Sequence, residues 1–269
     1  MPRLSAERER EMQGAGDIEL APMVGKAERP VPVAIAAPDE RRGFVRKVYG
    51  ILSAQLLVTV LLASLVVRHG RSWLLADPAA AQAALTLSSI AALGVAVVAS
   101  CCPAVMRRYP ENYCLLALLT VAESVLVGFV CLRYSYGSVL LCCGLSAGIV
   151  LGLSMYALRA RSDFTGRGPY LLSFMLVLCL LGLSLSAAAC LALASTAAFS
   201  VLQVVYAAGG ALMASFFLVY DTQLILGGEH AHEFSLDDYA MAALCIYLDI
   251  IQLFLSLVRL FGRQEDSGL

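Results

Sequence analysis

The sequence predicts an all-α membrane protein built as a bundle of seven transmembrane helices. Of its 269 residues, 60% are hydrophobic and 14% are charged, and the mean hydropathy is +0.80. A soluble domain has about 45–50% apolar and about 25% charged residues, so a water-soluble core could not bury this much apolar surface. The apolar residues form seven long runs joined by short connections, which predicts one compact bundle.

Each run is long enough to cross a bilayer, because a helix needs about 20 apolar residues to span about 30 Å of hydrocarbon. Charged residues, glycine or proline bound each run. The predicted spans cover residues 48–67, 79–105, 113–132, 138–158, 170–194, 199–226 and 239–261.

The segments outside these spans are polar. Residues 1–40 lack the apolar stretch of a signal peptide, and we interpret them as a disordered cytoplasmic tail. Residues 41–262 form the predicted transmembrane domain, and residues 263–269 form a short polar C-terminal tail. The first 47 residues hold 9 basic and 8 acidic side chains, so no basic face remains to bind nucleic acid.

The basic residues also predict the orientation. With the N-terminal tail in the cytoplasm and seven crossings, the cytoplasmic side receives 14 Lys and Arg and the other side receives 5, which favours a cytoplasmic N terminus. The last run is the least apolar, with Asp249, Gln252, Ser256 and Arg259. A re-entrant last segment that leaves the C terminus inside therefore remains an alternative.

Glycines recur every four residues in the fourth span, at Gly144, Gly148 and Gly152. They form a stripe without side chains along one face of the helix. Such a stripe predicts close packing against another helix.

Three acidic residues lie inside predicted spans. Glu123 and Asp249 are each about ten residues into their spans, and Asp221 is near the cytoplasmic end of the sixth. Each costs about 2.5–3.5 kcal/mol or more to place in hydrocarbon, which makes it a candidate functional residue. The alternative for each is an interhelical hydrogen bond that only holds the bundle together.

Helical periodicity places both aspartates on the interior of the bundle. Asp249 shares one polar stripe with Gln252 and Ser256, and Asp221 lies on the face that carries the small residues Gly210 and Ala214. The segment 235–238 has the pattern of a capping box, so the last two spans should form an antiparallel hairpin. Their aspartates can then meet.

Two carboxylates at about 4 Å repel by about 4 kcal/mol at an effective dielectric near 20. Asp221 and Asp249 would then share one proton and release it near neutral pH as a coupled pair, which is a proton sensor. The fully ionised pair offers several oxygen ligands to a hard cation such as Ca²⁺. The sequence therefore predicts a pH-gated cation path.

Four separated segments are together similar to the transmembrane BAX-inhibitor-motif family. The resemblance covers about residues 41–262, and Glu123 and the short loops make it most similar to the Golgi anti-apoptotic protein and lifeguard branch. The segments are Arg42-Gly43-Phe44-Val45-Arg46-Lys47-Val48-Tyr49, Asp163-Phe164-Thr165, Tyr220-Asp221-Thr222-Gln223 and Tyr247-Leu248-Asp249-Ile250-Ile251-Gln252-Leu253-Phe254.

The resemblance implies six helices around a central last helix. It also implies a pH-sensitive Ca²⁺ leak of Golgi, endoplasmic reticulum or related membranes, with other endomembranes and the plasma membrane as alternatives. The leak would lower organellar Ca²⁺ and inhibit apoptosis, with no enzymatic activity and no cofactor beyond Ca²⁺ as the permeant ion. Expected partners are membrane lipids, apoptotic regulators and Ca²⁺-release channels.

Site residues follow from the same resemblance. Asp221 and Asp249 match the paired aspartates of the family and would form the pH sensor, the gate and a transient Ca²⁺ site. Arg107 matches the basic residue that engages this pair in the closed state. Glu123 is a further candidate that could line the ion path.

Two other functions fit worse. An intramembrane aspartyl protease carries Gly-x-Gly-Asp at its second acid, where this chain has Ile246-Tyr247-Leu248-Asp249. A seven-helix receptor would need its N terminus outside, against the charge count. An anti-apoptotic membrane scaffold that binds regulators without conducting ions remains the alternative.

Overall fold

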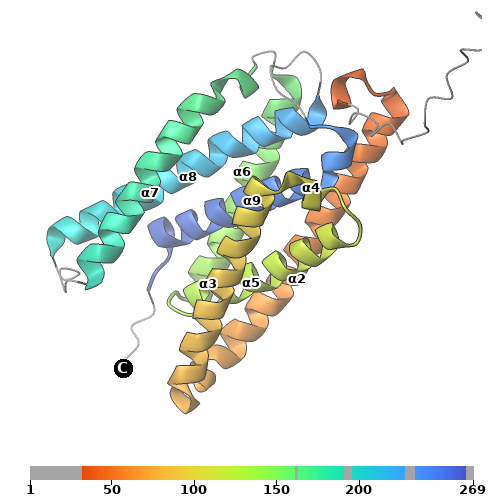
Figure 1. Cartoon of the computed structure of the whole chain (residues 1–269). Helices are drawn as coiled ribbons and strands as arrows, with labels where there is room; N and C mark the ends of the chain where they lie inside the picture. The colour runs from red at the N-terminus through yellow and green to blue at the C-terminus, as the bar shows by residue number, and fades with distance from the viewer. Residues whose placement is uncertain (1–31, 161–162, 191–195, 228–233, 265–269) are drawn as a thin grey trace, which may run out of the picture. The chain divides into compact units, whose positions relative to one another are not determined.

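The computed structural model describes residues 32–160, 163–190, 196–227 and 234–264. Seven helices in this part of the chain are long and apolar enough to cross a membrane, and no β-sheet occurs among the described residues. The all-α class and the seven predicted spans are thereby confirmed (Figure 1). The helices are α2 (Pro38–Ala76), α3 (Pro78–Cys101), α4 (Pro103–Met106), α5 (Glu111–Cys131), α6 (Tyr136–Arg159), α7 (Gly168–Cys190), α8 (Ala197–Leu226) and α9 (Tyr239–Phe261), with short 3₁₀ turns η1 (Val33–Ile35), η2 (Thr165–Arg167) and η4 (Leu236–Asp238).

The second predicted span is too long. Residues 79–105 were expected as one helix, but α3 ends at Cys101, and Pro103 begins the separate short helix α4. Cys102 between them has φ −129° and ψ 61°. Proline disfavours helical backbone in the residue before it and has no N–H for the preceding turn, so the chain breaks here.

The first helix extends beyond its apolar segment at both ends. α2 has 39 residues, which is about 58 Å at 1.5 Å per residue. It begins at Pro38, within the segment that was expected to be a disordered tail, and Asp39 and Glu40 lie in its first turn. Proline and acidic residues both favour a helix start, so the helix continues outside the hydrocarbon.

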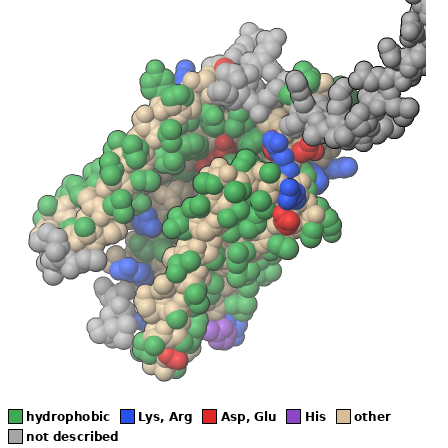
Figure 2. Space-filling model, viewed as in Figure 1, with side chains coloured by type: hydrophobic (Ala, Val, Ile, Leu, Met, Phe, Trp, Pro, Cys, Tyr) green, Lys and Arg blue, Asp and Glu red, His purple; other side chains and the backbone are tan. Residues whose placement is uncertain are grey.

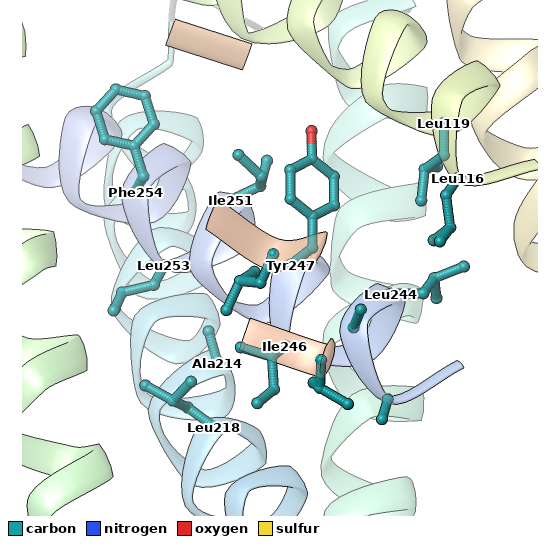
Figure 3. Close-up of a cluster of buried hydrophobic side chains, with 14 of the residues drawn as sticks. Leu116, Leu119, Ala214, Leu218, Leu244, Ile246, Tyr247, Ile251, Leu253 and Phe254 are labelled. Atoms are coloured by element: carbon teal, nitrogen blue, oxygen red, sulfur yellow. The ribbon is translucent and has the colours of Figure 1, made fainter. Parts of the chain in front are cut away.

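The last helix is the most buried one. In its most apolar stretch 61% of the residues are buried, against 6% for α7. α9 packs against α2, α5, α6 and α8, while α3 packs on α5 and α7 on α8. Figure 3 shows side chains of α9 reaching both neighbours, with Leu244 toward Leu116 of α5 and Ile246 toward Leu218 of α8. α9 thus occupies the core position that was expected of a central last helix.

Contacts at the two ends of the bundle show that α9 extends from one end of the bundle to the other. At the end where α8 stops and α9 starts, which we call the α8–α9 end, Arg41 Nη2 donates to the carbonyl oxygen of Gly227 at 3.2 Å. At the opposite end, the Ser135 N–H between α5 and α6 donates to the carbonyl oxygen of Arg263 at 2.8 Å. A re-entrant last segment would return the C terminus to the α8–α9 end, so this alternative is not the one adopted.

The outer surface of the helices is apolar. Large side chains such as Leu57, Leu87, Leu151 and Val201 are more than half exposed. Figure 2 shows hydrophobic side chains over most of the visible face. Such a surface is suited to contact with lipid chains, as expected for a multi-pass membrane protein.

The glycine stripe of α6 does not pack as predicted. A Cβ added to Gly144, Gly148 or Gly152 would meet no other atom within 4 Å, so within the described part of the chain the prediction of close helix packing there is wrong. The close approach is instead at Gly128 of α5, where a Cβ would lie 2.6 Å from Val66 Cβ of α2. Glycines spaced four residues apart identify a helix face without side chains, but this spacing does not show whether another helix packs against that face.

Substitution of Gly128 and of Gly148 by leucine should change the stability of the protein by different amounts. Gly128→Leu must push α2 and α5 apart, and overpacking of this kind costs about 1–3 kcal/mol. Gly148→Leu adds the same side chain to open space and should leave stability nearly unchanged. Thermal unfolding of the two purified variants in detergent checks this, and equal melting temperatures would contradict the assigned α2–α5 contact.

Candidate functional site

The two aspartates meet between α8 and α9. The side chains of Asp221 and Asp249 are hydrogen-bonded to each other. Asp221 is 6% exposed, and the Oδ2 atom of Asp249 is buried with no hydrogen-bond partner among the described residues. The predicted carboxylate pair is therefore present inside the apolar bundle.

A small-residue face on α8 allows the pair to form. Ala207, Gly210 and Ala214 are buried, as their spacing predicts. A Cβ at Gly210 would lie 2.7 Å from Ser256 Oγ and 3.3 Å from Gln252 Nε2 of α9. The polar stripe of α9 thus lies directly on the small-residue face of α8, and this contact sets the depth at which the aspartates meet.

Neighbouring segments hold the end of α8 in place. The Phe164 N–H donates to Gln223 Oε1 at 2.8 Å. Asp163 Oδ1 accepts hydrogen bonds from the Thr165 N–H and hydroxyl at 2.8 and 2.6 Å. The hydroxyl of Tyr49 in α2 is hydrogen-bonded to Thr222, the residue after Asp221. Motifs that are far apart in the sequence therefore converge on the helix turn that carries Asp221.

Arg107 lies elsewhere than predicted. Its Nε and Nη2 atoms donate to Oδ1 and Oδ2 of Asp238 at 2.6 and 3.1 Å, and no contact with Asp221 or Asp249 is found among the described residues. The hydrogen bond to Asp238 raises the pKa of Arg107, so the guanidinium stays charged.

Local geometry explains this difference. Arg107 follows α4 at the surface, and Asp238 is held within its reach by hydrogen bonds from the Ser235 N–H and hydroxyl. The side chain of Arg107 stays 40% exposed in this bidentate pair, which avoids the cost of burying a guanidinium. In this conformation Arg107 links α4 to the start of α9 and does not contact the aspartate pair.

Glu123 is also separate from the pair. It lies on α5 near Tyr247 of α9. Tyr247 and Asp249 are two residues apart on a helix, about 200° around its axis, so they project to opposite sides of α9. The structure therefore brings together two of the four predicted ionisable site residues.

A second group of buried polar contacts lies on the Tyr247 side of α9. The hydroxyls of Thr59 and Tyr247 are hydrogen-bonded at 2.8 Å, and Gln55 Nε2 donates to Thr120 Oγ1 at 3.1 Å. These contacts join α2, α5 and α9. None of these residues was among the predicted site residues, although Gln55 and Thr59 lie four residues apart in the first apolar run and so form a polar stripe.

Comparison with known proteins places the chain in a family. Residues 41–266 match the family model described as "Inhibitor of apoptosis-promoting Bax1". The chain belongs to this family. It is 32% identical over 252 residues to Protein LIFEGUARD 4 of Arabidopsis thaliana, covering 87% of this chain and 90% of the relative. It is 31% identical over 230 residues to Protein lifeguard 3 of Homo sapiens, covering 84% and 70%.

Family membership confirms two predictions. The recognised resemblance to BAX inhibitors and lifeguards is correct. The family comprises non-enzymatic membrane proteins, so this member is not an enzyme, and membership implies a role in the inhibition of apoptosis.

The site of this family member offers few ligands to a cation. No group of three or more His, Cys, Asp and Glu side chains that could hold a metal ion occurs among the described residues. A stable Ca²⁺ site needs six to eight oxygen ligands. The pair of Asp221 and Asp249 offers four carboxylate oxygens, which is fewer than this number.

The position of Arg107 leads to a prediction about energetic coupling. In a double-mutant cycle, Arg107→Gln and Asp238→Asn should be non-additive by about 0.5–3 kcal/mol, because each removes the other's partner. The matched cycle with Arg107→Gln and Asp249→Asn should be additive. Unfolding free energies of the six proteins in detergent check both, and coupling of Arg107 to Asp249 instead would overturn the assigned partner.

Proposed function

We propose that this protein is a pH-sensitive Ca²⁺ leak channel of Golgi or endoplasmic reticulum membranes that lowers organellar Ca²⁺ and thereby inhibits apoptosis. The observation that carries the proposal is the buried, mutually hydrogen-bonded pair of Asp221 and Asp249 between α8 and α9. A carboxylate pair in hydrocarbon is costly, and such groups mark proton or ion pathways.

Proton sensing follows from the repulsion between the two charges. Two carboxylates in hydrogen-bonding contact share one proton, since full ionisation costs about 4 kcal/mol at about 4 Å and an effective dielectric near 20. As the pH rises, the shared proton leaves and the charge of the pair changes from −1 to −2. The hydrogen bond between α8 and α9 is then lost, and a divalent cation is attracted to the oxygens.

The contact next to the pair serves as the gate in this proposal. Gly210 of α8 lies against Gln252 and Ser256 of α9, and a methyl group at this position would require the Ser256 hydroxyl to move. This tight packing continues the α8–α9 interface from the aspartates toward the opposite end. We interpret the structure as the closed state, in which the protonated pair and the Gly210 contact keep α8 and α9 together.

The proposed orientation places the α8–α9 end in the cytoplasm, where the greater number of Lys and Arg would lie. Asp221 is five residues from the end of α8, which is about 8 Å. The sensor would thus respond to cytoplasmic pH. A leak lowers the resting Ca²⁺ store and leaves less Ca²⁺ to be released during a death signal.

Ca²⁺ flux into liposomes that contain the purified full-length protein tests this proposal. The wild type should pass Ca²⁺ at a rate that rises with pH, because the shared proton leaves the pair as the pH rises. Asp249→Asn removes the repulsion and should flatten this pH profile, as should Asp221→Asn. Glu123→Gln is the matched control, because it neutralises an intramembrane acid on the other side of α9 and should leave the profile unchanged.

The outcomes separate channel from scaffold. A wild-type profile that the aspartate variants retain would contradict the sensor role of the pair. If folded wild-type protein passes no Ca²⁺ at any pH, the channel proposal fails. The anti-apoptotic scaffold would then be the better account, with apoptotic regulators or Ca²⁺-release channels as the partners to seek.

A further inference from the structure

A groove at the opposite end of the bundle is not used by the proposed channel function. It has a volume of about 850 Å³ and lies between α2, α5, α6 and α9. Its wall is mainly apolar, with Leu56, Val67, Val139, Val150 and Phe254 among the lining residues. This size and composition are typical of a site for an apolar ligand.

Two arginines stand at one end of the groove. Arg68 and Arg71 line it and are exposed, and neither is paired with an acidic side chain among the described residues. Both lie in the last turns of α2, at the end of the bundle that also holds the α5–α6 connection. A site with unneutralised guanidinium groups beside an apolar wall is complementary to a ligand with an anionic head and an apolar tail.

Two tyrosines indicate the depth of these arginines in the bilayer. Tyr134, from the connection between α5 and α6, and Tyr136, the first residue of α6, also line the groove. Tyrosine is enriched where hydrocarbon meets lipid headgroups, because its ring is apolar and its hydroxyl is polar. The arginines therefore lie at the depth of lipid phosphates, and the apolar wall lies at the depth of acyl chains.

We propose that this groove binds an anionic phospholipid from the leaflet at that end. The phosphate is held by Arg68 and Arg71, which offer forked N–H donors to phosphate oxygens. An acyl chain fills the space between α2, α5, α6 and α9. Guanidinium groups beside such a groove can pair with an anionic headgroup in this way.

The bound chain would contact the central helix. Ile250, Ile251 and Phe254 of α9 line the groove, as does Thr59, whose hydroxyl is hydrogen-bonded to Tyr247. The lipid would thus complete the packing of α9 on the side away from Asp249. The binding itself does not depend on the proposed ion conduction.

Native mass spectrometry of the full-length protein tests the proposal, with dioleoyl phosphatidylglycerol and dioleoyl phosphatidylcholine added in turn. The wild type should retain phosphatidylglycerol about tenfold better than phosphatidylcholine, because each arginine adds electrostatic attraction to an anionic lipid. Arg68→Gln/Arg71→Gln should lose this preference. Arg133→Gln is the matched control, because Arg133 is exposed in the same connection as Tyr134 but does not line the groove.

A second variant tests the acyl part of the site. Ala147 lines the groove on α6, and Ala147→Phe places a ring in it while both arginines remain. It should lower the retention of phosphatidylglycerol, with an unchanged melting temperature as evidence that the fold is intact.

Three results would overturn the proposal. The first is equal retention of the two lipids by the wild type, a comparison that needs no variant. The second is an unchanged preference in Arg68→Gln/Arg71→Gln. The third is a loss of the preference for phosphatidylglycerol in Arg133→Gln as large as that in Arg68→Gln/Arg71→Gln, which would assign the preference to general surface charge.

Discussion

The contact between two carboxyl groups in an apolar interior constrains much of this structure. Asp221 and Asp249 are hydrogen-bonded to each other there, which lowers the cost of burying them, and they can meet only where α8 and α9 approach closely. Gly210 provides that approach, since a Cβ at this position would lie 2.7 Å from Ser256 Oγ. The segment around Phe164 and the hydroxyl of Tyr49 then fix the end of α8, so that the depth of Asp221 matches that of Asp249.

The central helix carries different chemistry on its two sides. One side presents Asp249 to α8, and the other presents Tyr247 to Thr59 of α2, beside the groove with Arg68 and Arg71. A shift of α9 away from α8 would therefore disturb both sides together. In this account, protons act on the first side and a phospholipid stabilises the second, so that both can influence the same helix.

Much of the architecture could be predicted from the sequence, because apolar length and helical periodicity report burial directly. The seven spans, the inward faces of α8 and α9 and the meeting of the two aspartates all follow from such patterns. What could not be predicted depends on which surfaces meet. The glycine face of α6 has no helix packed against it, and α2 instead approaches Gly128 of α5. Arg107 pairs with Asp238 because hydrogen bonds at the start of α9 hold that carboxylate within reach.

The central claim is that Asp221 and Asp249 titrate as one unit, and infrared spectroscopy of the protonated carboxyl band tests it most directly. The protein is reconstituted in lipid and titrated in a Glu123→Gln background, which removes the third intramembrane acid. The account predicts one carboxyl band that disappears across the neutral range, and a shift of that titration in either Asp221→Asn or Asp249→Asn, because each variant removes the partner's charge. A titration of one aspartate that is unaffected by substitution of the other would contradict the account.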